Sequence, residues 1–357
     1  MAVPNTQTTL KIIAPGQFQV FASSPVPELD SDEILVQVVC IAINPVDAKS
    51  ADLSPTVGAT SGSDFSGKVV RRGSAVSEQT VQVGDRVCGC VFGNNPDRPE
   101  NGAFAQYIAV PADLIFKLPR GVSFETGATL GVGLSTVGMA LYHTWGLPLP
   151  EDKDCTVSNG PRYVLVYGGG TATGTLAIQM LRRSGLIPIT TCSPRNFSRV
   201  KSLGAAAAFD YASPTCGHDI QEFTKDTLSF ALDCITNLPS MKTCYEAIGR
   251  DGGQYLSLEP FPLRGHTRRS VKPKWILSLT MFNKPIQWKK PYQRVAKARD
   301  REFAAGWFRI AQELLSAGEI IPHPHRVSSN PGLESVIGGL DDVHKGKVAG
   351  VKLVYHV

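Results

Sequence analysis

The chain has 357 residues, of which 42% are hydrophobic and 19% charged, and its formal net charge is +5. This length predicts roughly two packed domains, and the composition excludes a disordered or coiled-coil protein. The mild net charge does not indicate a nucleic-acid binder.

Short β-branched runs alternate with turn residues over about the first 120 residues. Predicted strands cover 34–39, 67–70, 85–91 and 105–110, and Gly, Pro, Asp or Asn bounds each of them. This pattern predicts a β-rich, partly open barrel. The glycine-rich apolar segment 128–142 follows and predicts a helix whose small residues permit close approach by a neighbour or a ligand.

From Tyr163 onward, strands and helices alternate at intervals that are typical of a parallel sheet with crossover helices. Predicted strands cover 163–167, 187–191, 207–211, 230–235, 254–258 and 276–282, and predicted helices cover 174–184, 196–203 and 301–317. A last strand, 350–357, is expected back in the β-rich domain. We therefore expect an α/β protein with a doubly wound Rossmann domain over 126–319 and a β-rich domain made of 1–125 and 320–357.

The strongest chemical signal is the glycine turn between strand 163–167 and the helix after it. Gly168, Gly169 and Gly170 allow a tight turn, and the backbone N–H groups near Thr171, Ala172 and Thr173 can approach a pyrophosphate at the positive end of the helix. Residue 173 is Thr, so the strict G-x-G-x-x-G pattern is not met. A tight turn without a ligand is the alternative interpretation.

The end of the next strand indicates which dinucleotide is bound. An NAD site needs Asp or Glu there for the ribose 2′-hydroxyl, but this chain has Ser193, Pro194, Arg195 and Asn196 after Cys192. A hydroxyl, a guanidinium and an amide suit a 2′-phosphate, so NADPH is the predicted cofactor. The alternative for Arg195 is a solvated charge. Tyr211, after the third strand, is either a further cofactor contact or an ordinary strand-end tyrosine.

Several motifs resemble a known superfamily. The segments 83–87 (VGDRV) and 102–107 (GAFAQY), with the late glycine turn, are similar to medium-chain dehydrogenase/reductases. More narrowly, the chain resembles the trans-acting enoyl reductases of fungal polyketide synthases through 44–49 (NPVDAK), 191–197 (TCSPRNF) and 231–236 (ALDCIT). The resemblance runs nearly end to end, and it implies that the β-rich part is a GroES-like catalytic domain.

The resemblance also implies site residues. Those expected to touch NADPH are Val46, Asp47, Ala48, Lys49, Gly170, Thr171, Ala172, Thr173, Ser193, Pro194, Arg195, Asn196, Tyr211, Leu258, Glu259, Val348 and Ala349. Those expected to line an acyl pocket are Leu130, Gly131, Val132, Gly133, Leu134, Ser135, Thr136, Val137, Thr280, Met281, Phe282, Asn283 and Lys284. Two positions depart from the family: Ala48 stands where relatives have Trp, and Gly170 where Ser is usual.

Two further expectations concern metal and thiols. Zinc-dependent relatives use a Cys and a Gly-His-Glu segment where this chain has 61–64 (SGSD), and 92–101 contains no Cys for a structural zinc lobe. No metal is therefore expected.

The eight cysteines lack C-x-x-C pairs, which favours free buried thiols and a reducing compartment. Without a membrane-spanning apolar run or a secretory signal, a cytoplasmic protein is expected.

The expected reaction, reduction of a conjugated double bond, requires no metal. The protein must position the cofactor and supply donors to the developing oxyanion. Lys49 is the predicted catalytic residue, as cofactor anchor and as polariser or proton source, and an ordinary surface lysine is the alternative. The proton donor stays open between a side chain and water.

Basic residues concentrate late in the chain. The segment 264–301 has a net charge of +11 and leaves −6 for the rest, through Arg264, Arg268, Arg269, Lys272, Lys274, Lys284, Lys289, Lys290, Arg294, Lys297, Arg299 and Arg301 against Asp300. We expect it to dock the acyl carrier protein of a polyketide synthase or of a hybrid with a non-ribosomal peptide synthetase. A solvated face is the alternative.

The leading functional interpretation is an NADPH-dependent enoyl reductase that acts in trans on a polyketide enoyl thioester. A free-standing quinone or enone reductase is the second candidate. The third is a reductase-like subunit that binds the synthase without reducing anything. The sequence leaves open which polyketide is bound.

Overall fold

A computed structural model describes residues 3–150 and 162–357. The chain forms two compact units, which we call unit 1 (Met1–Ser135 with Leu279–Val357) and unit 2 (Thr136–Ser278). The sequence instead placed 126–135 and 279–319 in the parallel-sheet domain. Residues 126–135 are held in unit 1, where the Val132 N–H donates to Asp64. Residues after 279 belong there because helix α8 (Ala298–Ser316) packs on strand β7 (Ile115–Lys117) of unit 1. There the Lys117 N–H donates to Gln312 Oε1 at 2.6 Å, and Gln312 Nε2 donates to the Lys117 carbonyl oxygen at 3.1 Å.

Unit 1 contains a two-stranded sheet and a seven-stranded sheet. Strands β1 (Thr6–Ala14) and β2 (Gln17–Pro25) pair as an antiparallel hairpin. The larger sheet has the order β14-β15-β3-β4-β5-β7, with β6 on β3. Its remaining members are β3 (Glu33–Ala42), β4 (Asp64–Arg72), β5 (Arg86–Cys90), β6 (Tyr107–Pro111), β14 (His325–Val327) and β15 (Lys352–His356). The C-terminal strand β15 pairs with β3, which confirms its expected return to the β-rich domain.

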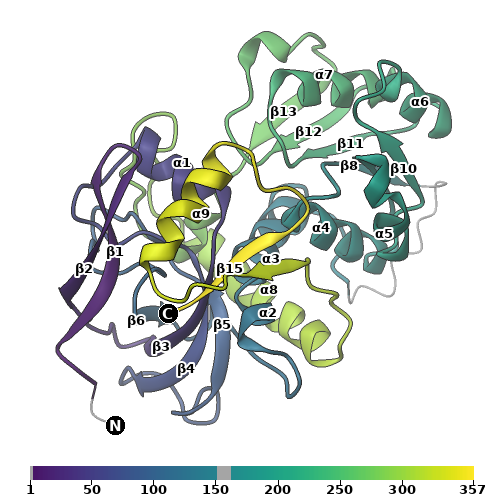
Figure 1. The fold of residues 1–357 in the computed structure, drawn as a ribbon. Coiled ribbons are helices and arrows are strands. Elements are labelled where there is room, and N and C mark those ends of the chain that lie inside the picture. The colour runs from purple at the N-terminus through teal and green to yellow at the C-terminus, as the bar shows by residue number, and fades with distance from the viewer. Residues whose placement is uncertain (1–2, 151–161) are drawn as a thin grey trace. The chain divides into compact units, whose positions relative to one another are not determined.

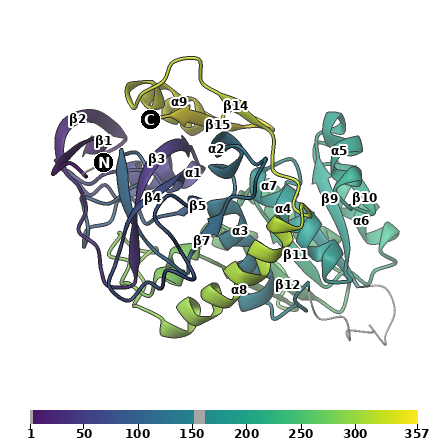
Figure 2. The same ribbon diagram turned by 90° about the horizontal axis from the view of Figure 1, so that it is seen from below.

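Two helices cover part of this sheet. Helix α1 (Pro45–Leu53) and helix α9 (Glu334–His344) lie side by side (Figure 1, Figure 2). Ala48 of α1 and Leu340 of α9 join the same buried cluster as Phe65 and Phe104. Burial of these apolar side chains therefore fixes α1, which bears the predicted catalytic lysine, to the interior of unit 1.

Unit 2 is the predicted doubly wound domain. Its six strands are all parallel, in the order β10-β9-β8-β11-β12-β13. They are β8 (Tyr163–Tyr167), β9 (Ile187–Cys192), β10 (Ala207–Asp210), β11 (Phe230–Asp233), β12 (Gly253–Ser257) and β13 (Val271–Trp275). In chain order this is 3-2-1-4-5-6, so the topological switch point, where such sheets bind dinucleotides, lies between β8 and β11.

Helices cover both faces of the unit 2 sheet. Figure 1 shows α4 (Ala172–Arg183) and α5 (Phe197–Ser202) on one face, and α6 (Cys216–Phe223) and α7 (Leu238–Ala247) on the other. Burial on both faces explains why strand 163–167 reads as a continuous apolar run rather than an alternating one.

Two predicted elements differ from the structure. The run 276–282 is not a strand: Ser278–Phe282 form a 3₁₀ helix, η4, and the sixth strand is β13. A short buried apolar run does not by itself distinguish strand from helix. The structure divides the predicted helix 128–142 between α3 (Gly131–Val137) and the π-helix η1 (Gly138–Thr144), and the short helix α2 (Phe124–Gly127) precedes it.

The described cysteines are free thiols, as expected. Cys40, Cys88, Cys90, Cys192, Cys216 and Cys244 are buried and Cys234 is half-buried, whereas Cys155 lies outside the described residues. Within 3–150 and 162–357, no helix is both long and apolar enough to cross a membrane.

Candidate functional site

The glycine turn of unit 2 joins β8 to α4 and leans against β9. Gly168 has a φ of +90°, which favours glycine, and the N–H groups of Gly168 and Gly169 donate to the Thr191 carbonyl at 3.2 and 2.9 Å. A Cβ on Gly169 would lie 2.1 Å from Thr190 Oγ1, and one on Gly174 would lie 2.3 Å from the Gly168 carbonyl oxygen. Gly169 therefore leaves room for the Thr190 side chain, and Gly174 leaves room for the backbone of the turn.

The turn leads directly into the N-terminus of α4. Thr171 is the N-cap, and its hydroxyl oxygen accepts from the Gly174 N–H at 3.0 Å. The N–H groups of Ala172 and Thr173 belong to the first helical turn, where a helix offers them no internal carbonyl. Such donors, with the helix dipole, suit a pyrophosphate. The residues present thus fit a dinucleotide, and the cofactor contacts predicted for 170–173 remain a prediction.

The end of β9 lies beside the glycine turn. We call the turn 168–173 and the β9 end, 193–196, together the cofactor cradle. Pro194–Asn196 form a short 3₁₀ helix, η2, and the Asn196 amide nitrogen donates to Ser193 Oγ at 3.3 Å. A Cβ on Gly170 would lie 3.0 Å from that same amide nitrogen, so the glycine turn and the β9 end meet at Asn196. Arg195 is exposed, and residues 187–200 contain no acid to oppose a 2′-phosphate.

The other predicted cofactor residues divide between the units. Tyr211 follows β10 and is 52% exposed, as a residue that stacks on a ligand requires. Leu258 and Glu259 follow β12 at the carboxyl edge of the same sheet, where Ser257 Oγ donates to the Glu259 carbonyl at 2.7 Å. In unit 1, Val348 packs on the core and Ala349 is exposed.

Helix α1 presents the four predicted residues 46–49 in different environments. Lys49 is exposed, Val46 is half-buried, and Asp47 and Ala48 are buried. The Ala48 side chain joins the core and lines a hollow of about 440 Å³ with Leu340. The cofactor contact predicted for Ala48 remains a prediction.

A buried polar cluster fixes the start of α1. Asp47 caps the helix by accepting from the Asn44 N–H at 2.7 Å, and its other oxygen accepts from Ser63 Oγ at 2.7 Å. Asn44 Nδ2 donates to Asp64 at 3.0 Å. Lys352, from β15, donates to Asn44 Oδ1 at 2.9 Å and forms an ion pair with Asp64. We call Asn44, Asp47, Ser63, Asp64 and Lys352 the carboxylate–lysine cluster.

The sequence interpretation missed this cluster as a unit. It noted that Ser63 and Asp64 lie where zinc-dependent relatives have ligands, and it named Asp47 as a cofactor contact, but it did not connect these residues with Lys352. In the structure, Lys352 supplies the positive charge beside the buried Asp64 carboxylate, and Asp64 also accepts from the Val132 N–H at 2.6 Å. The signal that could have revealed it is a lysine in the apolar C-terminal strand, because a buried lysine needs an acidic partner.

Burial changes the proton affinity of the helix cap. Loss of solvent raises the pKa of the Asp47 carboxyl to about 7, and the Asp64 charge acts in the same direction. Hydrogen bonds from Ser63 and Asn44, and the Lys352 charge, oppose this rise. Asp47 therefore takes up a proton near neutral pH inside the element that bears Lys49.

The predicted acyl-pocket residues are mostly buried. Of 130–137, only Val132 is half-exposed. Gly131 permits a close approach, since a Cβ there would lie 2.1 Å from the Gly89 carbonyl oxygen. Thr280, Met281 and Phe282 are buried in η4, whereas Lys284 is exposed and pairs with Asp30 at 3.6 Å.

A hollow of about 620 Å³ in unit 1 is lined partly by Phe282, Asn283 and Lys284. Its other walls include the charged side chains of Glu28, Asp30, Asp32, Glu33, Asp97, Arg98, Glu100 and Arg301. Such walls do not suit an apolar acyl chain. The acyl contacts of 280–284 thus remain a prediction that this hollow does not support.

Comparisons with known proteins define the class. Residues 30–120 match the model of the alcohol dehydrogenase GroES-like domain. The structure resembles that of CurK enoyl reductase, with a TM-score of 0.74 and 16% identity over 98% of this chain and 99% of that chain. With the Rossmann topology of unit 2, the fold is that of a medium-chain dehydrogenase/reductase, an oxidoreductase class that uses a nicotinamide cofactor.

Curated relatives narrow the class to a family. The trans-enoyl reductase apdC of Emericella nidulans is 53% identical over 357 residues, which cover 100% of this chain and 99% of that protein. The trans-enoyl reductase opdC of Penicillium oxalicum is 51% identical over 360 residues, covering 99% and 98%. The chain belongs to the trans-enoyl reductase family, which confirms the resemblance found in the sequence.

Proposed function

We propose that this protein reduces the α,β-double bond of an enoyl thioester carried on a polyketide synthase, with NADPH as the reductant. Full-length identity above 50% to named trans-enoyl reductases carries the proposal. The free thiols support a reducing compartment, the cytoplasm.

The cradle in unit 2 supports a dinucleotide that bears a 2′-phosphate. Bound NADPH would supply the hydride for the β-carbon of the substrate. The donors at the start of α4 would hold the pyrophosphate, and Ser193, Arg195 and Asn196 would hold the 2′-phosphate. Tyr211, Leu258 and Glu259 lie at strand ends on the same edge of the sheet, which supports further contacts with the cofactor.

Lys49 is the side chain proposed to act in catalysis. Lys49 is an exposed residue of α1, and the buried carboxylate–lysine cluster fixes the first turn of that helix. A fixed cation can anchor the cofactor or stabilise charge that develops on the thioester oxygen. Val46, Asp47 and Ala48 precede it on the same helix, and Val348 and Ala349 are proposed as further contacts from unit 1.

Titration with both cofactors tests the dinucleotide site. In Arg195→Ala, NADPH affinity should fall by about tenfold or more while NADH affinity stays unchanged, because only NADPH carries the extra phosphate. Lys201→Ala, at an exposed position of α5, is the matched control. Isothermal calorimetry that detects no NADPH binding by the parent protein would contradict the proposal.

Single-turnover oxidation of NADPH by a soluble enoyl thioester tests the reaction. Lys49→Met should lower the rate constant by about 100-fold or more if the ammonium stabilises the developing oxyanion. Lys68→Met, at an exposed position of β4, should leave it unchanged. Full activity in Lys49→Met would remove Lys49 from the mechanism.

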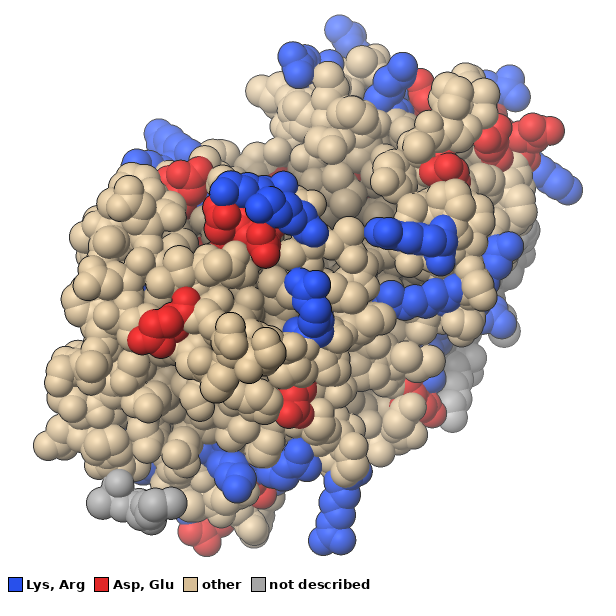
Figure 3. Space-filling model, viewed as in Figure 1, with Lys and Arg blue, Asp and Glu red and all other residues tan. Residues whose placement is uncertain are grey.

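The structure sharpens the proposed docking of an acyl carrier protein. Arg268 donates to the carbonyls of Tyr245, Ile248 and Gly249, and Arg301 pairs with Asp32 and Asp113, so these two cations have structural partners. Figure 3 shows Lys and Arg side chains in several separate groups on the face in view. The basic segment is thus divided among different roles.

The exposed lysines of the basic segment form two sets with different proposed roles. Lys272 and Lys274 lie on β13, an edge strand of the sheet, where lysines discourage strand pairing between molecules. Lys289, Lys290 and Lys297 are exposed in the connection to α8, and we propose them as the docking cations. Reversal of the second set to Glu should raise KM for a carrier-bound substrate and spare a small thioester. Equal loss on both substrates would contradict docking.

A further inference from the structure

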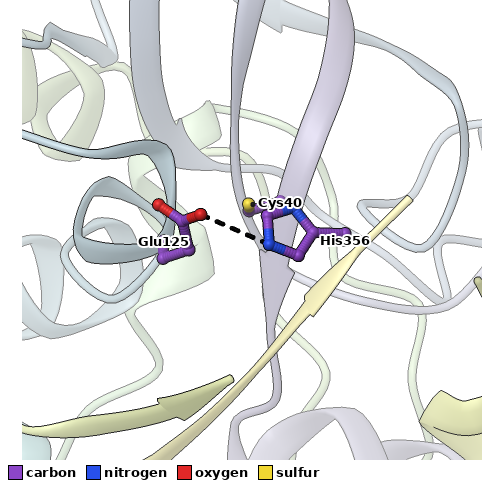
Figure 4. Close-up of side chains that lie close together, drawn as sticks. All are labelled: Cys40, Glu125 and His356. Carbon is purple, nitrogen blue, oxygen red and sulfur yellow. Dashed lines mark hydrogen bonds and ion pairs between the residues drawn. The ribbon is translucent and has the colours of Figure 1, made fainter. Parts of the chain in front are cut away.

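Three potential metal ligands meet in unit 1, away from the carboxylate–lysine cluster. Cys40 lies on β3, His356 on β15 and Glu125 on α2, and the three side chains point toward one another (Figure 4). Cys40 Sγ is 3.3 Å from His356 Nδ1, and His356 Nε2 is 3.3 Å from Glu125 Oε1. The strand register makes Cys40 and His356 directly opposite neighbours, so the pairing of β3 with β15 fixes their proximity.

We propose that Cys40, Glu125 and His356 form a binding site for a divalent transition-metal ion of the zinc class. One ligand atom from each residue lies within 4.8 Å of the others. In a tetrahedral zinc site, bond lengths of about 2.0–2.3 Å place ligand atoms roughly 3.3–3.5 Å apart. The 3.3 Å between Cys40 Sγ and His356 Nδ1 matches this spacing. Glu125 now contacts the other ring nitrogen, and its side chain, which is 28% exposed, would turn toward Nδ1 when an ion binds.

Burial and charge favour an ion of this kind. Cys40 is fully buried beside Ala42, Ala128 and Val354, and a thiolate in such apolar surroundings needs a neighbouring positive charge. A divalent cation would balance one thiolate and one carboxylate, and the neutral imidazole would complete a sulfur, nitrogen and oxygen donor set that zinc accepts. The exposed fraction of the His356 side chain, 42%, leaves the ion a path from solvent.

Cys40, His356 and Glu125 could also be interpreted as a catalytic triad, in which a histidine base contacts a thiol nucleophile and a carboxyl group orients the histidine. That interpretation requires a substrate to reach the sulfur. The Cys40 side chain exposes no surface, and His356 lies against it, so the geometry favours an ion that enters from the outer side.

Occupation of the site would link distant parts of the chain. Residues 40 and 356 lie near opposite ends of the sequence, and Glu125 precedes the segment that leads into α3. A bound ion would therefore hold the end of β15, the strand that also carries Lys352, against β3 and α2. These residues are distinct from 61–64, where zinc-dependent relatives hold their catalytic metal.

Titration of chelator-treated, untagged protein with Zn²⁺ and Co²⁺ tests the site. The full chain should bind one ion, and the cobalt form should show a thiolate-to-metal absorption band. Cys40→Ser should abolish the band, and His356→Asn and Glu125→Gln should each weaken binding by about 100-fold or more, beyond the loss typical of outer-shell changes. Cys234→Ser, at the half-buried thiol of unit 2, and His218→Asn, at an exposed histidine, should bind as the parent does.

Thermal unfolding keeps the test decisive if the buried Cys40 variant folds poorly. Zn²⁺ should raise the Tm of the parent protein more than that of Glu125→Gln, because stabilisation of the folded state falls as the affinity for the ion falls. The proposal is overturned if the parent binds no ion, if binding survives Cys40→Ser or His356→Asn, or if Zn²⁺ raises the Tm of Glu125→Gln equally.

Discussion

The cofactor cradle of unit 2 and the carboxylate–lysine cluster of unit 1 are built in opposite ways. In the cradle, Gly168 to Thr173 form one continuous turn, and most of its donors are backbone N–H groups. In the cluster, every contact involves at least one side chain, and the Lys352–Asp64 pair joins residues 288 positions apart. The glycine turn of the cradle is local in the sequence, whereas the cluster exists only after folding.

This difference shows where each site derives its stability. A backbone site tolerates different side chains wherever glycine is not needed for a close approach. Residue 173 can therefore be Thr, because Gly174, one position later, makes the close approach to the Gly168 carbonyl. A buried side-chain cluster requires every partner, because removal of one leaves a charge or a donor without compensation. Substitutions in the two units should therefore have different consequences.

Lys352→Met should have the largest effect. It leaves the Asp64 carboxylate buried without its cation, so the free energy of unfolding of unit 1 should fall by about 3–5 kcal/mol. Urea unfolding followed by tryptophan fluorescence measures this loss. Lys345→Met, in an exposed pair with Asp341, should leave the free energy of unfolding nearly unchanged. The double variant with Asp64→Asn should recover part of the loss, and no recovery would argue against a charge effect.

Gly174→Ala should have the next largest effect, in unit 2. Its Cβ would lie 2.3 Å from the Gly168 carbonyl oxygen, and backbone cannot move as freely as a side chain, so a loss of about 3 kcal/mol is expected. NADPH affinity should fall with it. Gly306→Ala in α8, where the nearest neighbouring atom is 3.9 Å away, should instead stabilise by roughly 0.5–1 kcal/mol. Differential scanning calorimetry compares the two, and equal effects would refute the packing argument.

Ser63→Ala should have a moderate and pH-dependent effect. The lost hydrogen bond to the Asp47 carboxylate should cost about 2 kcal/mol at neutral pH. Because the folded pKa of Asp47, about 7, lies above the ordinary value of 3.8, its contribution to stability falls as pH rises between these values. The hydroxyl favours the ionised carboxyl, so its removal should extend this decline to higher pH.

Unfolding measured from pH 4 to pH 9 tests this shift. Ser74→Ala, at an exposed position, should follow the parent protein at every pH. If Ser63→Ala and the parent have the same pH profile, Asp47 is not the titrating group.

Gly170→Ser should have the smallest effect. The new Cβ would lie 3.0 Å from the Asn196 amide, the end of a flexible side chain that can move aside. Stability should change by less than about 0.5 kcal/mol and NADPH affinity by less than about tenfold. Calorimetric titration measures both the parent and the variant. A larger loss would mean that Asn196 must stay in place to hold the cofactor, which would sharpen the model of the cradle.

Most of the fold could be predicted from the sequence because its signals are periodic and local. The parallel strands of unit 2, the C-terminal strand in unit 1 and the glycine turn are confirmed. The run 276–282 was assigned wrongly because apolar composition indicates burial but not conformation. The expected boundary after residue 319 differs because contacts of α8 with β7, distant in sequence, assign that helix to unit 1.

The sequence by itself determined the two-domain architecture, the dinucleotide motif and the family, since each depends on residues that are close together along the chain. Only the tertiary structure decided that Lys352 stabilises Asp64, that Asp47 caps the helix bearing Lys49, and that Cys40 meets His356 and Glu125. The physical reason is that burial and strand register set the charge environment of these groups, and neither can be read from neighbouring residues.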